Sequence, residues 1–306
     1  MATFLLIGGN GFIGANLAAR LHNYGHRSIT TLRRAPAMPD LQGAKIVLDW
    51  TSRHLIADLI DTQSIDVIVY LASSMIPSSP AQSYLAERSA LVEPFLQLGQ
   101  IAASRHIPLI YFSSGGAIYG ATASGAASES DECAPISFYG QLKLEIEQLV
   151  RFLHRTVGLE YIIVRPSNPF GRYQAGDGRQ GLIATIFSRV QAGQELEVWG
   201  DGRAIRDYIY VDDLVDAVVE LAGSGNQRNM TVNVGSGVGY SLLEVVNTVE
   251  CVLQRPIALH FRPGRATDVS RIVVDTEKLR SLVSVAPRSL EAGIRDFARI
   301  KGMIGD

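Results

Sequence analysis

Cysteine is scarce in this sequence, with only Cys133 and Cys251 among 306 residues. The two thiols have neither the close spacing of a metal site nor the repeated pattern of a disulfide framework. The six histidines are scattered, and their positions do not suggest a zinc site either. We therefore expect neither structural disulfides nor a bound metal ion.

The sequence also lacks long hydrophobic runs and an excess of one charge. No stretch approaches the roughly 18 apolar residues of a membrane span, and the apolar run at residues 4–7 is too short for a signal peptide and lacks a basic leader. Lysine and arginine number 28 against 30 acidic residues, which gives a net charge of −2. This balance favours neither nucleic acid nor a membrane as a partner, and we expect a cytoplasmic protein.

What is present is a globular composition, 47% hydrophobic and 19% charged, in a chain long enough for two domains. Short apolar runs of strand length occur at residues 3–7, 28–32, 45–48, 66–71, 109–114, 159–164 and 231–234. They alternate with helical patterns at residues 84–103, 138–155 and 211–221. This alternation predicts an α/β protein with a doubly wound, Rossmann-type parallel sheet covered on both faces. We expect a nucleotide-binding domain at residues 1–164 with a return segment at 206–236, and a smaller substrate domain at 165–205 and 237–306.

A glycine-rich turn follows the first predicted strand and opens the first predicted helix. Its sequence is GGNGFIG, and the residues expected to contact a dinucleotide are Gly8, Asn10, Gly11, Phe12, Ile13 and Gly14. Glycine lets the backbone approach a pyrophosphate closely, and the amides at a helix N-terminus meet its negative charge. The position of the turn directly after a strand predicts a nicotinamide dinucleotide site.

The end of the second predicted strand bears on the choice between NAD and NADP. Arg33 and Arg34 stand where a carboxylate would bind the adenosine ribose of NAD, and two guanidinium groups there would favour the 2′-phosphate of NADP. The alternative is that both arginines are exposed and indifferent to the cofactor. Asp49, after the third strand, either accepts from the adenine amino group or caps a turn.

Ligands in parallel sheets bind at the carboxyl ends of the strands, so the residues released there are candidates for the cofactor crevice. These residues are Leu71, Ala72, Ser73 and Ser74 after the fourth strand, Ser113 and Ser114 after the fifth, and Pro166 after the sixth.

The predicted helix at residues 138–155 carries Tyr139 and Lys143 one turn apart, so both side chains can address the same small volume. A cation beside a phenol favours the phenolate and lowers its pKa, which suits proton transfer. Lowering that pKa by roughly three units requires partial exclusion of water and a second positive charge, such as an oxidised nicotinamide ring.

Several blocks of the chain together resemble one family, the extended short-chain dehydrogenases/reductases that act on nucleotide sugars, especially UDP-hexose 4-epimerases. The blocks are GGNGFIG at 8–14, YLAS at 70–73, YFSSGGAIYG at 111–120, YGQLKLEIE at 139–147, RPSNPFG at 165–171, WGDGRAIRDYIYVDDL at 199–214, NVGSG at 233–237 and RPGRATDV at 262–269.

This resemblance implies that Tyr139 is the acid/base and that Lys143 binds the nicotinamide ribose while lowering the tyrosine pKa. It implies that Asn168, Arg206 and Arg265 hold the sugar diphosphate, and that two copies associate through the helices near 84–103 and 138–155. Independently of the resemblance, a guanidinium group suits a diphosphate better than an ammonium does. Trp199 either lines the nucleotide pocket or packs in the core.

One departure from the family pattern affects the chemistry. The usual catalytic Ser or Thr of the family falls on Gly115, so Ser114, a water molecule or an offset pairing has to supply the hydroxyl. The dehydratases of the family carry an Asp-Glu pair where this chain has Gly116 and Ala117, which disfavours dehydration. An NADP-dependent 4-reductase and a non-catalytic nucleotide-binding relative remain the alternatives to a UDP-hexose 4-epimerase.

Overall fold

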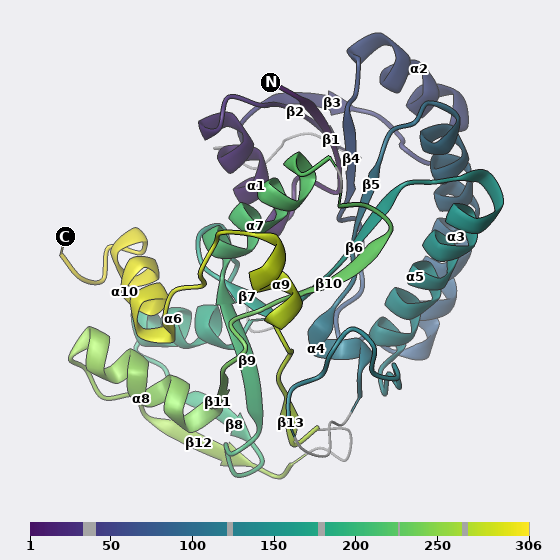
Figure 1. Ribbon diagram of the computed structural model, residues 1–306. Coiled ribbons are helices and arrows are strands. Elements are labelled where there is room, and N and C mark those ends of the chain that lie inside the picture. The colour runs from purple at the N-terminus through teal and green to yellow at the C-terminus, as the bar shows by residue number, and fades with distance from the viewer. Residues whose placement is uncertain (33–40, 121–124, 177–180, 226, 265–268, 306) are drawn as a thin grey trace. The chain divides into compact units, whose positions relative to one another are not determined.

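The computed structural model describes residues 1–32, 41–120, 125–176, 181–225, 227–264 and 269–305. The chain forms two compact units (Figure 1). The first unit comprises residues 1–114, 137–165 and 215–232, and the second comprises residues 115–136, 166–214 and 233–306.

The first unit is built on a seven-stranded sheet. Its strand order is β10 (Met230–Val234), β6 (Tyr161–Pro166), β5 (Leu109–Phe112), β4 (Val67–Tyr70), β1 (Thr3–Ile7), β2 (Arg27–Leu32) and β3 (Ala44–Val47). Neighbouring strands from β6 to β3 pair in parallel. The predicted Rossmann-type sheet is therefore confirmed, and the runs that predicted its strands differ from the observed ones by at most two residues at either end.

Helices cover both faces of this sheet. The helices of the first unit are α1 (Phe12–Asn23), α2 (Arg53–Gln63), α3 (Ala81–Ser104), α5 (Phe138–Val157) and the greater part of α7 (Val211–Gly223). Figure 1 shows α2, α3 and α5 on one face and α1 and α7 on the other. An ion pair between Arg20 and Asp216 joins α1 to α7, and α3 packs along α5. Because both faces are covered, every residue of β1 is buried.

Local sequence sets the limits of α5, the helix that carries the predicted reactive pair. Ser137 precedes it and accepts a hydrogen bond from the backbone N–H of Gly140 at 3.1 Å, which caps the first turn. Gly158 follows it with a φ of +74°, the left-handed conformation that ends many helices. Tyr139 and Lys143 therefore lie in the first two turns of a well-capped helix.

The second unit has its own core and two smaller sheets. In one sheet β9 (Ile205–Tyr210) pairs with β7 (Asn168–Phe170), β11 (Gly239–Ser241) and β13 (Arg271–Ile272), and in the other β8 (Leu196–Trp199) pairs with β12 (Leu259–Arg262). Its helices are α4 (Gly115–Ile118), α6 (Leu182–Ala192), α8 (Leu242–Leu253), α9 (Glu277–Leu282) and α10 (Leu290–Ile300). Helices α6, α8 and α10 pack against these strands through a cluster of buried apolar side chains.

The observed units differ from the expected domains by small shifts at residues 165 and 233–236 and in two larger segments. Residues 115–136 belong to the second unit, because Ala127 bridges to Val274 and accepts a hydrogen bond from the Asn233 side chain at 2.8 Å. Residues 206–214 also belong there, because β9 pairs with three strands of that unit. Both differences arise from long-range pairing that composition along the chain does not reveal.

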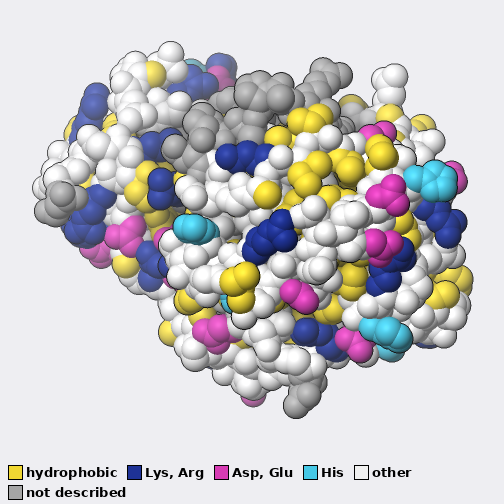
Figure 2. Space-filling view, turned by 90° about the horizontal axis from the view of Figure 1, so that it is seen from above, with side chains coloured by type: hydrophobic (Ala, Val, Ile, Leu, Met, Phe, Trp, Pro, Cys, Tyr) yellow, Lys and Arg dark blue, Asp and Glu magenta, His cyan; other side chains and the backbone are white. Residues whose placement is uncertain are grey.

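The surface carries its charges in a mixed pattern. Figure 2 shows Lys and Arg side chains interspersed with Asp and Glu on one face of the molecule. Within the ranges that the structure describes, no helix is both long and apolar enough to cross a membrane. The same ranges contain no group of three or more His, Cys, Asp or Glu side chains that could hold a metal ion.

Candidate active site

The glycine turn and the end of β4 meet at close range. Gly8 has a φ of +83°, and a Cβ added to it would lie 2.6 Å from the backbone nitrogen of Ala72. A Cβ added to Gly14 would lie 2.4 Å from the Cα of Gly9. Neither position tolerates a side chain, so the glycines are required by the packing of β1, α1 and β4. This packing brings Leu71 and Ala72 beside the turn, as the sequence predicted for a shared crevice.

The start of α1 fits an anionic group. Gly11 occupies the N-cap position without a capping side chain, and Phe12, Ile13 and Gly14 form an uncharged first turn. Helix N-termini carry unsatisfied backbone N–H groups and a partial positive charge, which suit a pyrophosphate. The residues of this turn therefore fit a dinucleotide. Asn10 lies half-buried within the same turn.

Three residues were predicted to affect the binding of the adenosine half of the cofactor, and the structure describes one of them. Arg33 and Arg34 lie outside the described residues. Asp49 is exposed, and its carboxylate accepts hydrogen bonds from the backbone N–H of Thr51 at 3.0 Å and the Thr51 hydroxyl at 2.6 Å. This is the turn-capping arrangement, one of the two alternatives that the sequence left open.

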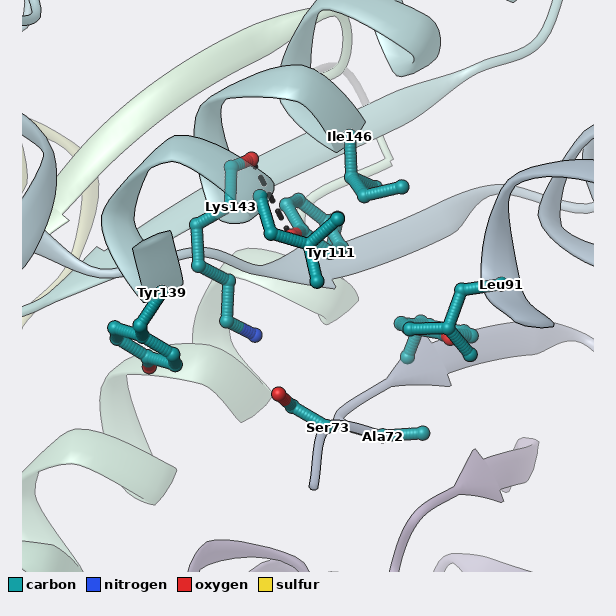
Figure 3. Close-up of a pocket in the computed structure, with 9 residues that line it drawn as sticks. Ala72, Ser73, Leu91, Tyr111, Tyr139, Lys143 and Ile146 are labelled. Carbon is teal, nitrogen blue, oxygen red and sulfur yellow. Dashed lines mark hydrogen bonds between the residues drawn. The ribbon is translucent and has the colours of Figure 1, made fainter. Parts of the chain in front are cut away.

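Tyr139 and Lys143 lie side by side on α5, as their spacing predicted. The Lys143 Nζ donates a hydrogen bond to the Phe112 carbonyl at 2.9 Å and lies 5.6 Å from the centre of the Tyr139 ring. Only 7% of Lys143 is exposed to solvent. Figure 3 shows its amine and the Ser73 hydroxyl pointing toward one another from α5 and from the end of β4.

A small cavity separates these groups. Its volume is about 10 Å³, the space of one water molecule. The residues that line it come from β4, α3, β5 and α5, and are Tyr70, Ala72, Ser73, Leu91, Tyr111, Tyr139, Leu142, Lys143 and Ile146. The reactive pair therefore borders a small, largely apolar space.

Burial shifts both pKa values away from the charged forms. It raises the pKa of Tyr139 to about 12, and a hydrogen bond from Ser114 only partly opposes this shift. Burial lowers the pKa of Lys143 to about 8, against the influence of Glu87 and then Glu147, whose carboxylates favour the ammonium. Burial therefore sets the direction of the Tyr139 shift in the chain alone. The predicted lowering of this pKa, which requires a second positive charge beside Lys143, stays a prediction.

This pKa of Lys143 predicts a stability cost at neutral pH. Its ordinary value is 10.5, so between pH 8 and 10.5 the unfolded chain binds this proton while the folded chain does not, and the free energy of unfolding rises with pH. Below pH 8 both states are protonated, and burial of the ammonium costs on the order of 3 kcal/mol.

Replacing Lys143 with methionine is therefore expected to raise the free energy of unfolding at pH 7, by at most about 3 kcal/mol. The gain should shrink as the pH rises from 8 toward 10.5. Urea unfolding at pH 7 and 9.5 measures both effects, with the exposed Lys45→Met as the matched control. A gain of equal size at both pH values would contradict a buried ammonium.

Ser114, the residue before Gly115, brings a hydroxyl to the phenol of Tyr139. Ser114 forms a side-chain hydrogen bond with Tyr139 that favours the phenolate. Gly115 begins the short helix α4. Of the three alternatives left open by the sequence, the structure therefore favours Ser114. Ser113, directly before it, is buried at the end of β5.

An ion-pair network that the sequence did not predict lies close to Lys143 on α5. Glu147, fully buried, accepts two hydrogen bonds from Arg165 at 2.9 and 2.7 Å and one from Arg151 at 2.8 Å. Arg165 is itself only 2% exposed. The spacing of Glu147, four residues beyond Lys143 on the same helical face, could have indicated it.

A second carboxylate that the sequence did not predict is that of Glu87 on α3. Its carboxylate accepts hydrogen bonds from the Ser73 hydroxyl at 3.0 Å and the Ser74 backbone N–H at 2.7 Å. Both serines were predicted to face ligands, and the structure shows that both also bind this carboxylate. Nothing in the spacing of the chain connects residue 87 with residues 73 and 74, so only the fold reveals the contact.

The residues predicted to hold the sugar nucleotide lie in the second unit. Asn168 opens β7, and its Nδ2 donates to the Asp207 carbonyl at 2.7 Å. A Cβ added to Gly116 would lie 3.3 Å from Asn168 Oδ1, so the carboxamide faces this glycine. Pro166 ends β6 and is buried, and Arg265 lies outside the described residues.

Arg206 and Trp199 are both accessible to a ligand. Arg206, on β9, is half-buried, and its Nη1 donates to the Ile205 carbonyl at 2.8 Å. Trp199, on β8, is 44% exposed, so the alternative that it packs in the core is wrong. Asp207, next to Arg206, is buried, and it accepts hydrogen bonds from the Ser236 hydroxyl at 2.7 Å and the Gly237 N–H at 3.1 Å.

Comparisons with known proteins agree with this geometry. Residues 4–235 match the model of the NAD dependent epimerase/dehydratase family. The chain is 28% identical over 313 residues to a UDP-glucose 4-epimerase of Lacticaseibacillus casei, covering 93% of this chain and 92% of that one. It is 29% identical over 321 residues to a dTDP-4-dehydro-6-deoxy-D-allose reductase of Streptomyces bikiniensis, covering 97% and 95%.

A solved structure has the same fold. The UDP-glucose 4-epimerase of Thermus thermophilus in complex with NAD superimposes with a TM-score of 0.88 at 23% sequence identity. The match covers 97% of this chain and 98% of that one.

Proposed function

We propose that this chain, which belongs to the NAD dependent epimerase/dehydratase family, is a UDP-hexose 4-epimerase that works through a transient 4-keto sugar. The observation that carries the proposal is the hydrogen bond between Ser114 and Tyr139 beside the buried Lys143. These three groups supply a proton acceptor, a hydroxyl that stabilises it and a cation, which serve the proton transfer in the oxidation of a secondary alcohol. The hydride would go to a nicotinamide cofactor.

A nicotinamide dinucleotide fits the first unit. Gly8, Gly11 and Gly14 would hold its pyrophosphate, and Leu71, Ala72 and Ser73 line the adjoining edge of the sheet. When bound, this cofactor takes up the hydride that the sugar loses and returns it. The UDP-glucose 4-epimerase of Thermus thermophilus was solved with NAD, which supports NAD, whereas Arg33 and Arg34 support NADP on chemical grounds.

Tyr139 has to move one proton in each direction. As phenolate it accepts the proton of the C4 hydroxyl while the carbon is oxidised, and as phenol it returns the proton to the keto oxygen. Its pKa of about 12 keeps it protonated in the ligand-free chain. A further positive charge in this largely apolar site would favour the phenolate, together with the Lys143 ammonium and the Ser114 hydroxyl.

The nucleotide has to stay bound while the sugar turns over. We assign this role to Asn168, Trp199, Arg206 and Arg265. A guanidinium group can bind two oxygens of a diphosphate at once, and an exposed indole can stack on a base. Ser74 and Ser114 would contact the sugar.

A nucleotide-sugar 4-reductase is the second candidate. It is favoured by the 29% identity to a dTDP-4-dehydro-6-deoxy-D-allose reductase, which is no lower than the 28% identity to an epimerase. A 4,6-dehydratase is disfavoured because Gly116 and Ala117 supply no acid to expel a hydroxyl. A non-catalytic relative is disfavoured because Tyr139 and Lys143 are both retained.

The deciding experiment incubates purified protein, without added cofactor, with UDP-glucose, UDP-N-acetylglucosamine and their 4-epimers. An epimerase interconverts a pair of epimers, which NMR of the anomeric protons detects. A reductase instead consumes reduced cofactor in proportion to a 4-keto sugar supplied. Mass spectrometry of nucleotides released from the purified protein identifies the dinucleotide. Tight dinucleotide binding without turnover of any sugar would contradict the proposal.

The role of Ser114 gives a further expected result. Replacing Ser114 with alanine should lower kcat by about 10- to 100-fold, because one hydrogen bond to the forming phenolate is lost. It should also move the pH dependence of kcat to higher pH, since the hydroxyl lowers the Tyr139 pKa. A double variant, S114A with Gly115→Ser, should recover part of the loss. An unchanged kcat in S114A would contradict this role of Ser114 and would indicate that a water molecule supplies the hydrogen bond to Tyr139.

We further propose a cytoplasmic homodimer that associates through α3 and α5. These helices pack on each other and carry Leu85, Phe138 and Phe152, which are 64%, 44% and 47% exposed. Light scattering of the purified chain tests the dimer, and a monomer at micromolar concentration would contradict it.

A further inference from the structure

Glu87 binds the turn that follows β4 with both carboxylate oxygens. Oε1 accepts from the Ser73 hydroxyl at 3.0 Å and the Ser74 N–H at 2.7 Å, and Oε2 contacts the Ser74 hydroxyl. The Ser73 hydroxyl in turn accepts from the Met75 N–H at 3.2 Å. One side chain of α3 thus holds consecutive residues of this turn.

The turn lies between the glycine turn and the reactive lysine. On one side Ala72 abuts Gly8, leaving no space for a Cβ. On the other side Ala72 and Ser73 line the cavity that Lys143 borders, and Figure 3 shows the Ser73 hydroxyl directed at the lysine amine. Any displacement of the Ser73–Ser74 turn would therefore change the surroundings of both the glycine turn and Lys143.

The negative charge of Glu87 also acts on Lys143, where it favours the ammonium form. The side chains beside this lysine are Tyr139 on its own helix, Tyr111 on β5 and Tyr70 on β4. The carboxylates whose charge favours its ammonium are Glu87 on α3 and then Glu147 on its own helix. The carboxylate of Glu147 is engaged by the guanidinium groups of Arg165 and Arg151. Hydroxyl and amide groups bind the carboxylate of Glu87, and such neutral partners leave its full negative charge in place.

We propose that Glu87 is a positioning residue for the reaction: it fixes the Ser73–Ser74 turn against Lys143 and supplies the negative charge that keeps the lysine as an ammonium. The role in turnover rests on the proposed function, because it assumes that Tyr139 and Lys143 transfer a proton. The effect on Lys143 itself does not depend on any substrate. The two parts can therefore be tested separately.

The first test measures the titration of Lys143 in the free protein. The chain has four lysines, Lys45, Lys143, Lys278 and Lys301, so NMR of protein labelled with ¹³C at lysine Cε gives few signals, and Lys143→Arg identifies one of them. The midpoint for Lys143, about pH 8 in the natural chain, should move to lower pH in Glu87→Gln. Glu87→Asp, which keeps the charge, should bring the midpoint back toward the natural value.

Glu145→Gln is the matched control. Glu145 lies on α5 at the same pair of helices, but its carboxylate is bound by Arg88 at 2.6 Å and by Tyr84 at 3.1 Å. This variant should leave the Lys143 midpoint in place. A midpoint in Glu87→Gln that moves no further than in the control would overturn the proposed charge effect.

The second test follows turnover against pH with the sugar nucleotide that the natural chain converts. Glu87→Gln should lower kcat about ten-fold, with a smaller change in KM, and should shift the alkaline limb of the profile to lower pH. A proportional loss at every pH would indicate a merely structural role and overturn the proposal. If the natural chain converts no sugar, the proposed function fails, while the Lys143 titration still decides the role of Glu87.

Discussion

Replacing Tyr139 with phenylalanine is expected to lower kcat by about 10²- to 10⁴-fold, the range that a positioned acid/base contributes. The change removes one oxygen atom and leaves the ring in the cluster of apolar side chains against which it packs. Dinucleotide binding should persist, because the glycine turn that would hold the pyrophosphate is formed by β1 and α1. The measurements are kcat by NMR of epimer interconversion and dinucleotide affinity by calorimetry.

The matched control is Tyr84→Phe. Tyr84 presents its phenol from the neighbouring helix α3, where it donates to Glu145 at 3.1 Å, and its ring contacts Phe138 rather than Tyr139. This control should keep kcat within about two-fold of the natural value, because Tyr84 is not among the residues that line the cavity beside Lys143. If Y139F retained most of the activity, this result would contradict the assignment of Tyr139 as the acid/base and, with it, the proposed mechanism.

Replacing Glu147 with methionine is expected to lower the free energy of unfolding by about 3–5 kcal/mol, the usual cost of breaking a buried ion pair. Glu147 is fully buried and Arg165 is only 2% exposed, so the substitution leaves the Arg165 guanidinium inside the protein without its carboxylate. Arg151, with 31% of its side chain exposed, can turn to water and should add little. Urea unfolding followed by fluorescence at pH 7 measures the loss.

A double-mutant cycle separates the interaction energy between Glu147 and Arg165 from the contribution that each side chain makes alone. Arg165→Met alone should be about as destabilising as Glu147→Met, because it leaves a buried carboxylate, whereas the double variant should recover most of the loss. The reason is that an apolar pair of similar volume needs no desolvation of charge. Losses that simply add in the double variant would show that the two side chains contribute independently, contrary to the pairing seen in the structure.

The elements of the first unit were predictable because their signals are local. The apolar run at residues 3–7 is β1, and the amphipathic pattern from residue 138 is α5, with Ser137 and Gly158 as its caps. The start of α8 in the second unit is also set locally, because Ser241 and Glu244 form a capping box there. Each of these features depends on hydrogen bonds or periodicity within a few residues.

The chemistry of the candidate site was predictable only in part. The i, i+4 spacing placed Tyr139 beside Lys143, but it could not give the sign of the phenol pKa shift, which burial by β4, β5 and α3 decides. The motif showed that Gly115 occupies the position of the family's usual catalytic hydroxyl. That Ser114 lies beside the phenol instead could be seen only in the folded chain. Glu87, far from the motif in sequence, was not found at all.

The parallel sheet, the glycine turn and the tyrosine–lysine pair could all be predicted from local patterns, because periodicity, backbone freedom and helical spacing act between neighbours in the chain. The tertiary structure alone decided where one unit ends and the other begins, which serine meets Tyr139, and which carboxylates surround Lys143. Those outcomes depend on desolvation and on contacts between segments that are distant in sequence, and both exist only once the chain has folded.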